Sequence, residues 1–305
     1  MKKKETAPKK IESLSELHRL VGLPGPLHPM ISLVENKDNK IDLSKFPDSF
    51  VHDFYKISLK TRLTGKIRYG QGYYDFDEGG LLFKAPNQVS ANAEISQDHS
   101  GFTVLFHPDF LAGYPLAKKI KQYGFFSYSV NEALHLSDKE KSTIISVFRS
   151  IQEELNSPID DFSQDVVISQ IELLLNYCNR FYKRQFVTRK AVNSNLLQKF
   201  EEILNDHFSS EKQLKEGLPT VNSLADQLNM TPSYLSDMLR SLTGQNTQQH
   251  IHNKLIEKAK EKLSTTDLSV SEIAYELGFE HSQSFCRFFK TKTNQSPLQF
   301  RASFN

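Results

Sequence analysis

The sequence predicts an α+β protein with two domains. The N-terminal domain is expected to be a small antiparallel β-barrel with two long helices, and the C-terminal domain to be all-α, with two helix-turn-helix units joined by a linker helix. Three observations predict this class. Short aromatic and β-branched runs separated by glycines fill residues 50–107, as in small barrels. Helical spacing dominates after Pro108. An apolar helical pattern that begins at Val221 recurs from Val270, near the C-terminus.

Composition and length agree with a folded protein of about two domains. The chain has 305 residues, of which 38% are hydrophobic and 24% charged, as is typical of globular proteins. No apolar run is long enough to span a membrane. The basic N-terminus MKKKETAPKK leads into no apolar stretch, so no secretory signal is expected. The two cysteines, Cys178 and Cys286, are far apart, which argues against a disulfide framework or a structural zinc site and favours the cytoplasm.

The first domain is expected over residues 11–186. Residues 11–45 contain three prolines and few periodic patterns, so we predict a loop there. The barrel strands are predicted in the segments VHDFYKISL, KIRYG, GYYDF, LLFKAP and FTVLF. Short runs of this composition, bounded by turn residues, are typical of strands in an antiparallel sheet.

Two long helices are predicted after the strands. Ser137 and Glu140 have the spacing of a capping box, which begins a helix that ends near Leu155. The second helix is predicted at about 162–185, with a wide apolar stripe at helical spacing. The stripe consists of Val167, Ile168, Ile171, Leu174, Leu175, Cys178, Phe181 and Tyr182. It either packs on the first domain or also forms a dimer seam, and the sequence leaves both alternatives open.

The C-terminal domain is expected over residues 196–305. The polar, unpatterned segment VTRKAVNSN, residues 187–195, predicts an interdomain linker before it. A helix is predicted from Leu196 to about Phe208, and the following SSEKQLKEGLP is predicted to be a loop.

Two copies of a helix-turn-helix pattern occupy most of this domain. In each copy a short helix has apolar residues at i, i+3, i+4 and i+7, and a turn leads into a second amphipathic helix. The second helices are expected at about 232–242 and 282–292, with one extra residue in the turn of the second copy. The apolar positions of the first helices are Val221, Leu224, Ala225 and Leu228 in one copy and Val270, Ile273, Ala274 and Leu277 in the other.

Capping residues support both copies. Thr231-Pro232 combines an N-cap with a proline at the first helical position. Ser269 and Glu272 have the spacing of a capping box, and Gly278 suits the left-handed residue that ends a helix.

A helix of about 16 residues, 247–262, is predicted to join the two copies. It spans about 24 Å and can hold two recognition helices near the ~34 Å repeat of successive major grooves. With this layout, residues 196–303 closely resemble the DNA-binding domain of AraC/XylS-type regulators. The resemblance rests on SVSEIAYELGFEHSQSFCRFFKTKTNQSPLQFR and on LADQLNMTPSYLSDMLRSLTG. The upstream half is similar, less specifically, to the cupin-like sensor domain of the same family.

The resemblance implies a sequence-specific regulator that places one recognition helix of each unit in adjacent major grooves of promoter DNA. It also implies contact with RNA polymerase, association with the nucleoid when DNA is bound, and a first domain that senses a small-molecule effector or an internal signal. A homodimer through about 162–185 is a further expectation. No cofactor is expected.

The buried stripes leave an outward face on each recognition helix. Arg287 can bind guanine bidentately and Gln283 can bind adenine, and the resemblance places both at base-reading positions. Lys290, Thr291 and Arg240 are better placed for phosphates. For each side chain the alternative is an ordinary solvated helix face. The expected DNA-contacting residues are Ser233, Ser236, Asp237 and Arg240 in the first unit and Gln283, Ser284, Arg287, Lys290 and Thr291 in the second.

Charge is a weak guide in this domain. Residues 196–305 carry 12 Lys and Arg against 13 Asp and Glu, although residues 281–305 hold four basic residues and no acid. Asp237 departs from the basic or neutral residue that similar proteins often have there. Either the first unit binds more weakly, which we favour, or Asp237 accepts a hydrogen bond from cytosine N4.

No metal site or catalytic group is expected. The histidines of the first domain are isolated and are interpreted as structural, and its acidic group lies beside two glycines, as in a solvated hairpin loop. These residues are His52, His99 and His107, and Asp75, Asp77 and Glu78. A cupin-like enzyme with an appended helical domain is the rival hypothesis. An interaction protein whose helix-turn-helix units have lost DNA binding is the third.

Overall fold

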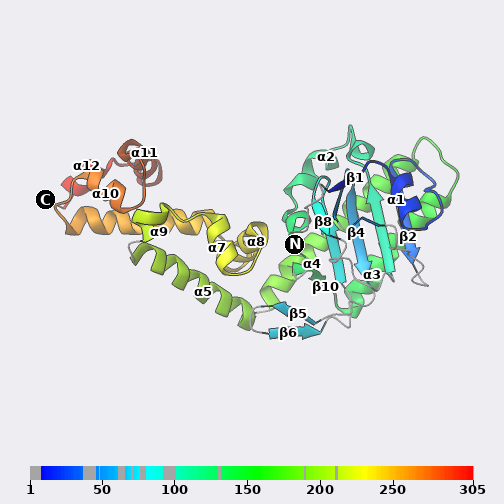
Figure 1. The fold of residues 1–305 in the computed structure, drawn as a ribbon, viewed down its shortest axis with the longest axis horizontal. Helices are drawn as coiled ribbons and strands as arrows, with labels where there is room; N and C mark the ends of the chain where they lie inside the picture. Colours follow the sequence, from blue (N-terminus) through cyan, green and yellow to red (C-terminus); the bar gives the residue numbers. More distant parts are fainter. Residues whose placement is uncertain are drawn as a thin grey trace, which may run out of the picture. The chain divides into compact units, whose positions relative to one another are not determined.

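The computed structural model describes most of the chain, which divides into two compact units, Met1–Gln185 and Phe186–Asn305. Their ribbons are drawn in Figure 1. No helix among the described residues is long and apolar enough to cross a membrane. The described residues are 8–36, 46–47, 49–60, 66–69, 72–75, 80–91, 101–129, 132–188, 190–209 and 212–304.

A five-stranded antiparallel sheet forms the centre of the first unit, in the order β10-β7-β4-β9-β2. A second sheet has the order β1-β3-β8, and β5 and β6 form a hairpin. The α+β class is therefore confirmed. Within the described residues the strands form three sheets that do not close, so a barrel remains a prediction. The strands are β1 (Lys9–Ile11), β2 (Ile31–Asn36), β3 (Ser49–His52), β4 (Tyr55–Lys60), β5 (Lys66–Tyr69), β6 (Gly72–Asp75), β7 (Gly80–Lys84), β8 (Val89–Ala91), β9 (Gly101–Phe106) and β10 (Leu134–His135).

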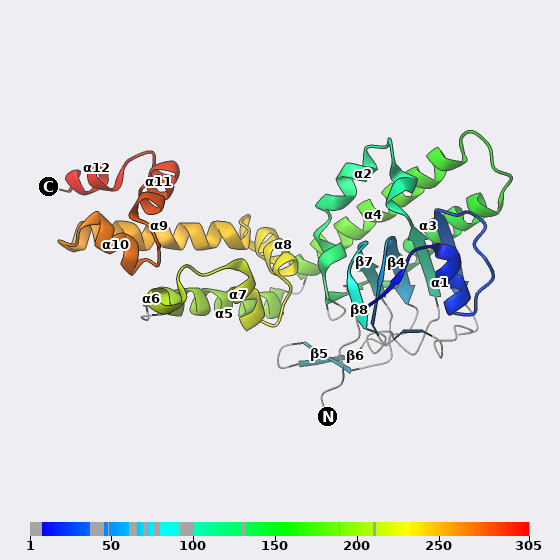
Figure 2. The same ribbon diagram turned by 45° about the horizontal axis from the view of Figure 1, so that its top comes forward.

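Two long helices, α3 (Asp138–Asn156) and α4 (Ser163–Thr188), cover one face of this sheet (Figure 2). Phe102 of β9 stacks on Phe148 of α3, with 5.5 Å between ring centroids. The predicted capping box begins α3, where the Ser137 and Glu140 side chains each accept a hydrogen bond from the other residue's backbone N–H. Apolar burial on this face stabilises the unit, and a further buried cluster includes Ile11 of β1, Phe50 of β3 and Phe54.

The predicted apolar stripe of α4 lies in this core, because all eight of its residues are buried. The interpretation that the stripe packs on the first domain is therefore confirmed. Burial raises the pKa of the Cys178 thiol, which agrees with its interpretation as a small buried apolar residue. Three large apolar residues of α4 are exposed, Val166, Leu173 and Val187.

The predicted loop over residues 11–45 is wrong for much of its length. β1 extends to Ile11, α1 (Leu14–Leu20) follows, and β2 begins at Ile31. Ser13 caps α1 by accepting a hydrogen bond from the Glu16 backbone N–H at 3.1 Å. So short a helix has too few positions for a periodic pattern to be recognised, and tertiary packing stabilises it. The remaining short helices of this unit are η2 (Pro108–Leu111), α2 (Leu116–Lys119), η3 (Ile120–Gln122) and η4 (Gly124–Ser127).

The histidines that the structure describes have structural surroundings. His107 Nδ1 accepts a hydrogen bond from the Asp109 backbone N–H at the start of η2. His52 is only 3% exposed and stacks on Phe54 at 4.5 Å. Burial, and then the positive charge of Lys56, lower the pKa of His52 to about 4. Among the described residues, no group of three potential metal ligands is present, and His99, Asp77 and Glu78 lie outside them.

Acid is expected to destabilise the first unit through His52. The unfolded chain protonates this histidine near pH 6.5, whereas the folded chain does so only near pH 4. Its contribution is therefore fully present above pH 6.5 and is lost as the pH falls toward 4, by about 2–3 kcal/mol. Urea unfolding at a series of pH values measures the loss. His52→Gln should flatten this pH dependence, and an unchanged slope in that variant would contradict the assignment.

The second unit is all helical, and its first two helices correct the sequence prediction. Residues 187–188 belong to α4 and residues 190–195 to α5, so the expected unpatterned linker is helical where it is described. Asn193 is buried and its side-chain amide donates to the Phe186 carbonyl. A short helix, α6, occupies part of the predicted SSEKQLKEGLP loop. The helices are α5 (Lys190–Ser209), α6 (Lys212–Glu216), α7 (Val221–Gln227), α8 (Pro232–Thr243), α9 (Thr247–Thr265), α10 (Val270–Glu276), α11 (Ser282–Thr293) and α12 (Pro297–Ala302).

Helix α9 is the predicted linker helix and is the central helix of this unit. Its buried residues recur every fourth position, at Ile251, Leu255, Ala259 and Leu263. Such a stripe lies along one side of a helix. Helices α8, α10 and α12 all contact α9, so α9 positions both helix-turn-helix units.

Candidate nucleic-acid interface

The two helix-turn-helix units share their hydrogen bonds as well as their apolar pattern. In the first, Thr243 Oγ1 donates to the Leu239 carbonyl at 2.8 Å. At the equivalent place in the second, Thr293 Oγ1 donates to the Phe289 carbonyl at 2.8 Å. Each threonine hydroxyl then accepts from the backbone N–H of a following glutamine. The recurrence shows that the repeat extends to the local geometry that ends each recognition helix.

Left-handed residues locate the extra residue of the second copy. Asn229 (φ 54°) and Gly278 (φ 88°) end the first helices of the two copies. Gly244 (φ 77°) and Asn294 (φ 61°) end the second helices. The interval from Gly244 to Asn294 is longer by a single residue than the interval from Asn229 to Gly278. The additional residue therefore lies between Gly278 and the end of α11, in agreement with its predicted place in the turn.

The repeat extends beyond the predicted helix-turn-helix units. Asn246 and Gln249 form a capping box at the start of α9, and Ser296 and Gln299 form another at the start of α12. Asn246 and Ser296 are 50 residues apart, and so are Gly244 and Asn294, which end the two recognition helices. The first turn of α9 is therefore equivalent to α12, a relation that the sequence analysis missed. The pattern N-x-x-Q and S-x-x-Q could have shown it.

The turn between α10 and α11 is held against the segment that follows α6. A Cβ atom on Gly278 would lie 2.9 Å from the Gly217 carbonyl carbon and 3.1 Å from the Leu218 backbone nitrogen. The Gly217 carbonyl oxygen in turn lies 2.9 Å from His207 Nε2 of α5. Backbone approach this close positions α11 relative to the rest of the unit and requires a glycine.

All five candidate residues of the second recognition helix are exposed. The structure brings them together on the face of α11 opposite the buried Phe285 and Phe289. Within the described residues neither Arg287 nor Lys290 is paired with an acidic group. Thr291 Oγ1 donates to the Arg287 carbonyl at 2.8 Å, so its hydroxyl can only accept from a further partner. The five residues are Gln283, Ser284, Arg287, Lys290 and Thr291.

The first recognition helix presents a different surface. Asp237 Oδ1 accepts from Arg240 Nη1 at 2.8 Å, and Arg240 is exposed. Ser233 is partly exposed. Ser236 Oγ lies 3.0 Å from Oγ1 of Thr247, which is fully buried. Ser236 is therefore engaged in packing α8 on α9, a role that the sequence analysis did not foresee.

The two faces therefore differ in charge at equivalent positions. Asp237 and Arg287 are related by the repeat, as are Arg240 and Lys290. The ion pair within α8 cancels its two charges, whereas the face of α11 opposite Phe285 presents two basic side chains, Arg287 and Lys290, and no acid. Phosphates are attracted by such uncompensated positive charge.

Arg301 does not add to this basic surface. Its guanidinium donates to the Leu263 carbonyl at 3.2 Å and to the Leu268 carbonyl at 2.7 Å. These contacts satisfy backbone oxygens where α9 ends and the chain turns toward α10. The four basic residues counted over 281–305 therefore include one with a structural role.

Comparisons with known proteins agree with this arrangement. Residues 224–303 match the model of a helix-turn-helix domain family. The HTH-type transcriptional activator RhaS of Escherichia coli O1:K1 / APEC is 29% identical over 266 residues, which cover 86% of this chain and 90% of RhaS. The Msm operon regulatory protein of Streptococcus mutans is 21% identical, with 82% of this chain and 85% of that protein covered.

A solved structure is also similar to part of the chain. The C-terminal domain of the two-component response regulator yesN from Fusobacterium nucleatum is 30% identical over 35% of this chain and 98% of that domain, with a TM-score of 0.32. The curated relatives are transcription regulators and not enzymes.

Proposed function

We propose that the chain is a transcription regulator of the AraC/XylS type, and that α8 and α11 read two adjacent major-groove segments of promoter DNA, with the second unit contributing more. The observation that carries this proposal is the exposed face of α11. It combines a guanidinium, an ammonium and an amide without an acid. Specific DNA binding needs both phosphate contacts and base-edge contacts, and this face offers both.

Individual roles follow from side-chain chemistry. Arg287 presents the fork that matches guanine O6 and N7, and Gln283 can bind adenine N6 and N7. Lys290 and Arg240 are assigned to phosphates, as is Thr291 through a bridging water that donates to it. Ser284 and Ser233 are placed to make secondary contacts near the helix starts. Ser236 is assigned a positioning role, because it is bonded to Thr247.

Asp237 makes the first unit the weaker of the two in this proposal. Its carboxylate repels phosphates and occupies Arg240, which would otherwise contact them. The alternative is that Asp237 accepts from cytosine N4 through its second oxygen.

Asp237→Asn is expected to raise DNA affinity about threefold at low salt. The substitution removes one negative charge and releases Arg240 toward the phosphates. Fluorescence anisotropy at two salt concentrations, with an operator selected from random duplex DNA, measures the change. Asn keeps the side chain's shape, so packing is conserved. A fall in affinity confined to operators with one particular C·G pair would instead favour cytosine readout.

Selection from random duplex DNA with the full chain tests the proposal as a whole. Two short motifs about one helical turn apart are expected. Salt-dependent binding without any motif would show that phosphate contacts are present without base readout. An absence of binding at low salt would contradict the proposal.

The regulator is further proposed to act in the cytoplasm on chromosomal DNA, to contact RNA polymerase, and to respond to a small molecule through a cupin-like first unit. A homodimer is proposed through the outward face of α4, since the predicted stripe is used inside the unit. Val166 and Leu173 are two helical turns apart and lie on one side of the helix, both exposed.

Leu173→Glu is expected to weaken self-association at least tenfold. A charge in a desolvated seam is costly, whereas the same change at Ile159, which is exposed outside the helix, should leave association unchanged. Analytical ultracentrifugation of the two variants provides the comparison. Equal masses for Leu173→Glu and the parent chain at all concentrations would contradict this seam.

A further inference from the structure

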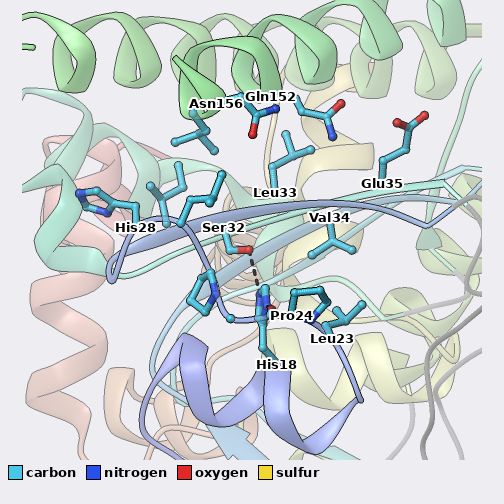
Figure 3. Close-up of a pocket in the computed structure, with 15 residues that line it drawn as sticks. His18, Leu23, Pro24, His28, Ser32, Leu33, Val34, Glu35, Gln152 and Asn156 are labelled. Atoms are coloured by element: carbon cyan, nitrogen blue, oxygen red, sulfur yellow. Dashed lines mark hydrogen bonds between the residues drawn. The ribbon is translucent and has the colours of Figure 1, made fainter. Parts of the chain in front are cut away.

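The first unit contains a cavity of about 280 Å³ beside the outer strand of its main sheet. The walls come from α1 and the segment that follows it, from β2, and from the end of α3 (Figure 3). All of these elements belong to one unit. The cavity lies outside the sheet, and none of the candidate DNA-binding residues lines it.

β2 exposes main-chain groups to this cavity. The His107 backbone N–H donates to the Met30 carbonyl at 2.8 Å, in register with the pairing of β2 and β9. Hydrogen-bonded pairs alternate along an antiparallel ladder. Ser32 therefore bonds to β9, whereas the N–H and C=O groups of Ile31 and Leu33 point away from the sheet. Among the described strands β2 pairs with β9 alone, so these groups have no partner strand.

Side chains of other elements line the cavity on both sides of the β2 edge. Leu33 points toward α3, where Gln152 and Asn156 lie one helical turn apart (Figure 3). Val34 points to the opposite face, toward Pro24 and the segment after α1 (Figure 3). Since neighbouring strands lie about 4.8 Å apart, an open strand edge with a wall on either side has the form of a slot for one more strand.

His18 fixes one wall in place. It is 5% exposed, its Nε2 lies 2.9 Å from Ser32 Oγ, and its Nδ1 is bonded to the Pro24 carbonyl. The imidazole thereby ties the segment after α1 to a side chain of β2 and not to the strand's main chain. The outward groups of Ile31 and Leu33 are left facing the cavity.

We propose that this slot binds a short extended peptide, which adds to β2 as a sixth strand. Main-chain hydrogen bonds to Leu33 would supply affinity, and alternate side chains would contact the two walls. Residues 31–35 span about 13 Å, the length of roughly four extended residues. The lining has no lysine or arginine, so a neutral peptide is preferred to an acidic one.

The peptide site itself does not depend on DNA binding. Any effect of an occupied slot on promoter binding would rest on the proposed function. Peptide retention and operator binding are therefore measured separately on the same protein. Retained peptide with lost operator binding would contradict the proposed function alone.

The probe is a pool of tetrapeptides of valine, leucine and threonine with free amino termini, and the measurement is equilibrium dialysis against the full chain. The matched variants are Leu33→Pro and Leu33→Ala. Both remove the leucine side chain, but only proline removes the outward N–H, and an edge position tolerates proline because this N–H is not part of the ladder. The loss of this hydrogen bond is expected to weaken retention by Leu33→Pro about tenfold relative to Leu33→Ala.

Two further measurements keep the proposal testable if Leu33→Pro folds poorly. A pool with N-methylated amides has the same side chains but no backbone amide N–H donors, and the parent chain should not retain it. Hydrogen exchange of residues 31–36 in the parent chain should slow when the unmodified pool is added. Four outcomes would each overturn the peptide site. The first two are no retention of the unmodified pool by the parent chain, and retention of the N-methylated pool. The others are unchanged hydrogen exchange, and equal retention by the two variants while β2 is still paired to β9.

Discussion

Gly278→Ala is expected to destabilise the C-terminal unit by about 3 kcal/mol. An L-residue at φ 88° costs about 1–2 kcal/mol. The added Cβ would lie 2.9 Å from the Gly217 carbonyl carbon, and this backbone cannot yield easily because His207 holds the Gly217 carbonyl oxygen at 2.9 Å. Relief of the overlap requires a backbone shift, which adds a similar cost. Because the shift moves α11, DNA affinity should fall as well.

Gly244→Ala is the matched control for this prediction. Gly244 has φ 77°, but a Cβ there meets no atom within 4 Å. It should therefore show the cost of the left-handed conformation alone, about 1 kcal/mol. Hydrogen exchange followed by mass spectrometry reports on residues 212–300 of the full chain without interference from the first unit. Equal effects of the two substitutions would mean that the close approach of Gly278 to Gly217 adds nothing.

Arg287→Ala is expected to lower operator affinity by about 10- to 100-fold and to relax base preference at one position. A bidentate contact to guanine contributes about 1–3 kcal/mol of discrimination. Arg287 is paired with no acidic group among the described residues, so its removal should leave folding intact. Binding to the selected operator and to its variants at each position measures both effects.

Two substitutions separate base reading from charge. Arg287→Lys keeps the charge but loses the planar fork, so it should recover little of the discrimination. Lys290→Ala should weaken binding to all sequences alike. It should also reduce the slope of the logarithm of the binding constant against the logarithm of salt concentration by about one. If Arg287→Ala also weakened all sequences equally, Arg287 would be a phosphate contact and not a base reader.

Most of the C-terminal unit could be predicted because its signals are local. The apolar spacing of α7 and α10, the N-cap at Thr231 and the capping box at Ser269 each involve residues within one or two turns. The start of α5 was missed because its polar first turns carry no apolar period. Its buried Asn193 is satisfied by the Phe186 carbonyl, a contact that composition does not reveal.

Side-chain roles that depend on contacts with other helices could not be predicted as well from the sequence. Ser236 has the spacing of an outward residue, yet it bonds Thr247 of α9. Arg301 contributes to a basic segment in sequence, yet it binds carbonyl oxygens at the end of α9. In both cases the partner is fixed by tertiary packing and not by helical periodicity.

In the N-terminal unit, tertiary contacts limited prediction from the sequence even more. Six of the ten described strands overlap the predicted segments, since β-branched and aromatic runs identify them, whereas β1, β2, β8 and β10 were not predicted. The order of the strands could not be predicted, because β4 lies between β7 and β9 in the sheet, whereas β5 and β6 are the strands that follow it in the chain. Pairing of this kind depends on contacts that are distant in sequence.

The equivalence of α12 with the first turn of α9 has a consequence for operator geometry. One repeat simply continues through α9 into the next, so the length of α9 sets both the separation and the rotational phase of the two recognition helices. Each added residue advances the second helix by about 1.5 Å and rotates it by about 100°. Insertion of two full turns, roughly seven residues, would restore the phase to within about 20° while extending the reach by about 10 Å, or roughly three base pairs. Because three base pairs also rotate the major groove by about 100°, a longer α9 would not by itself fit a longer operator, so the length of α9 specifies one spacing between the two DNA motifs.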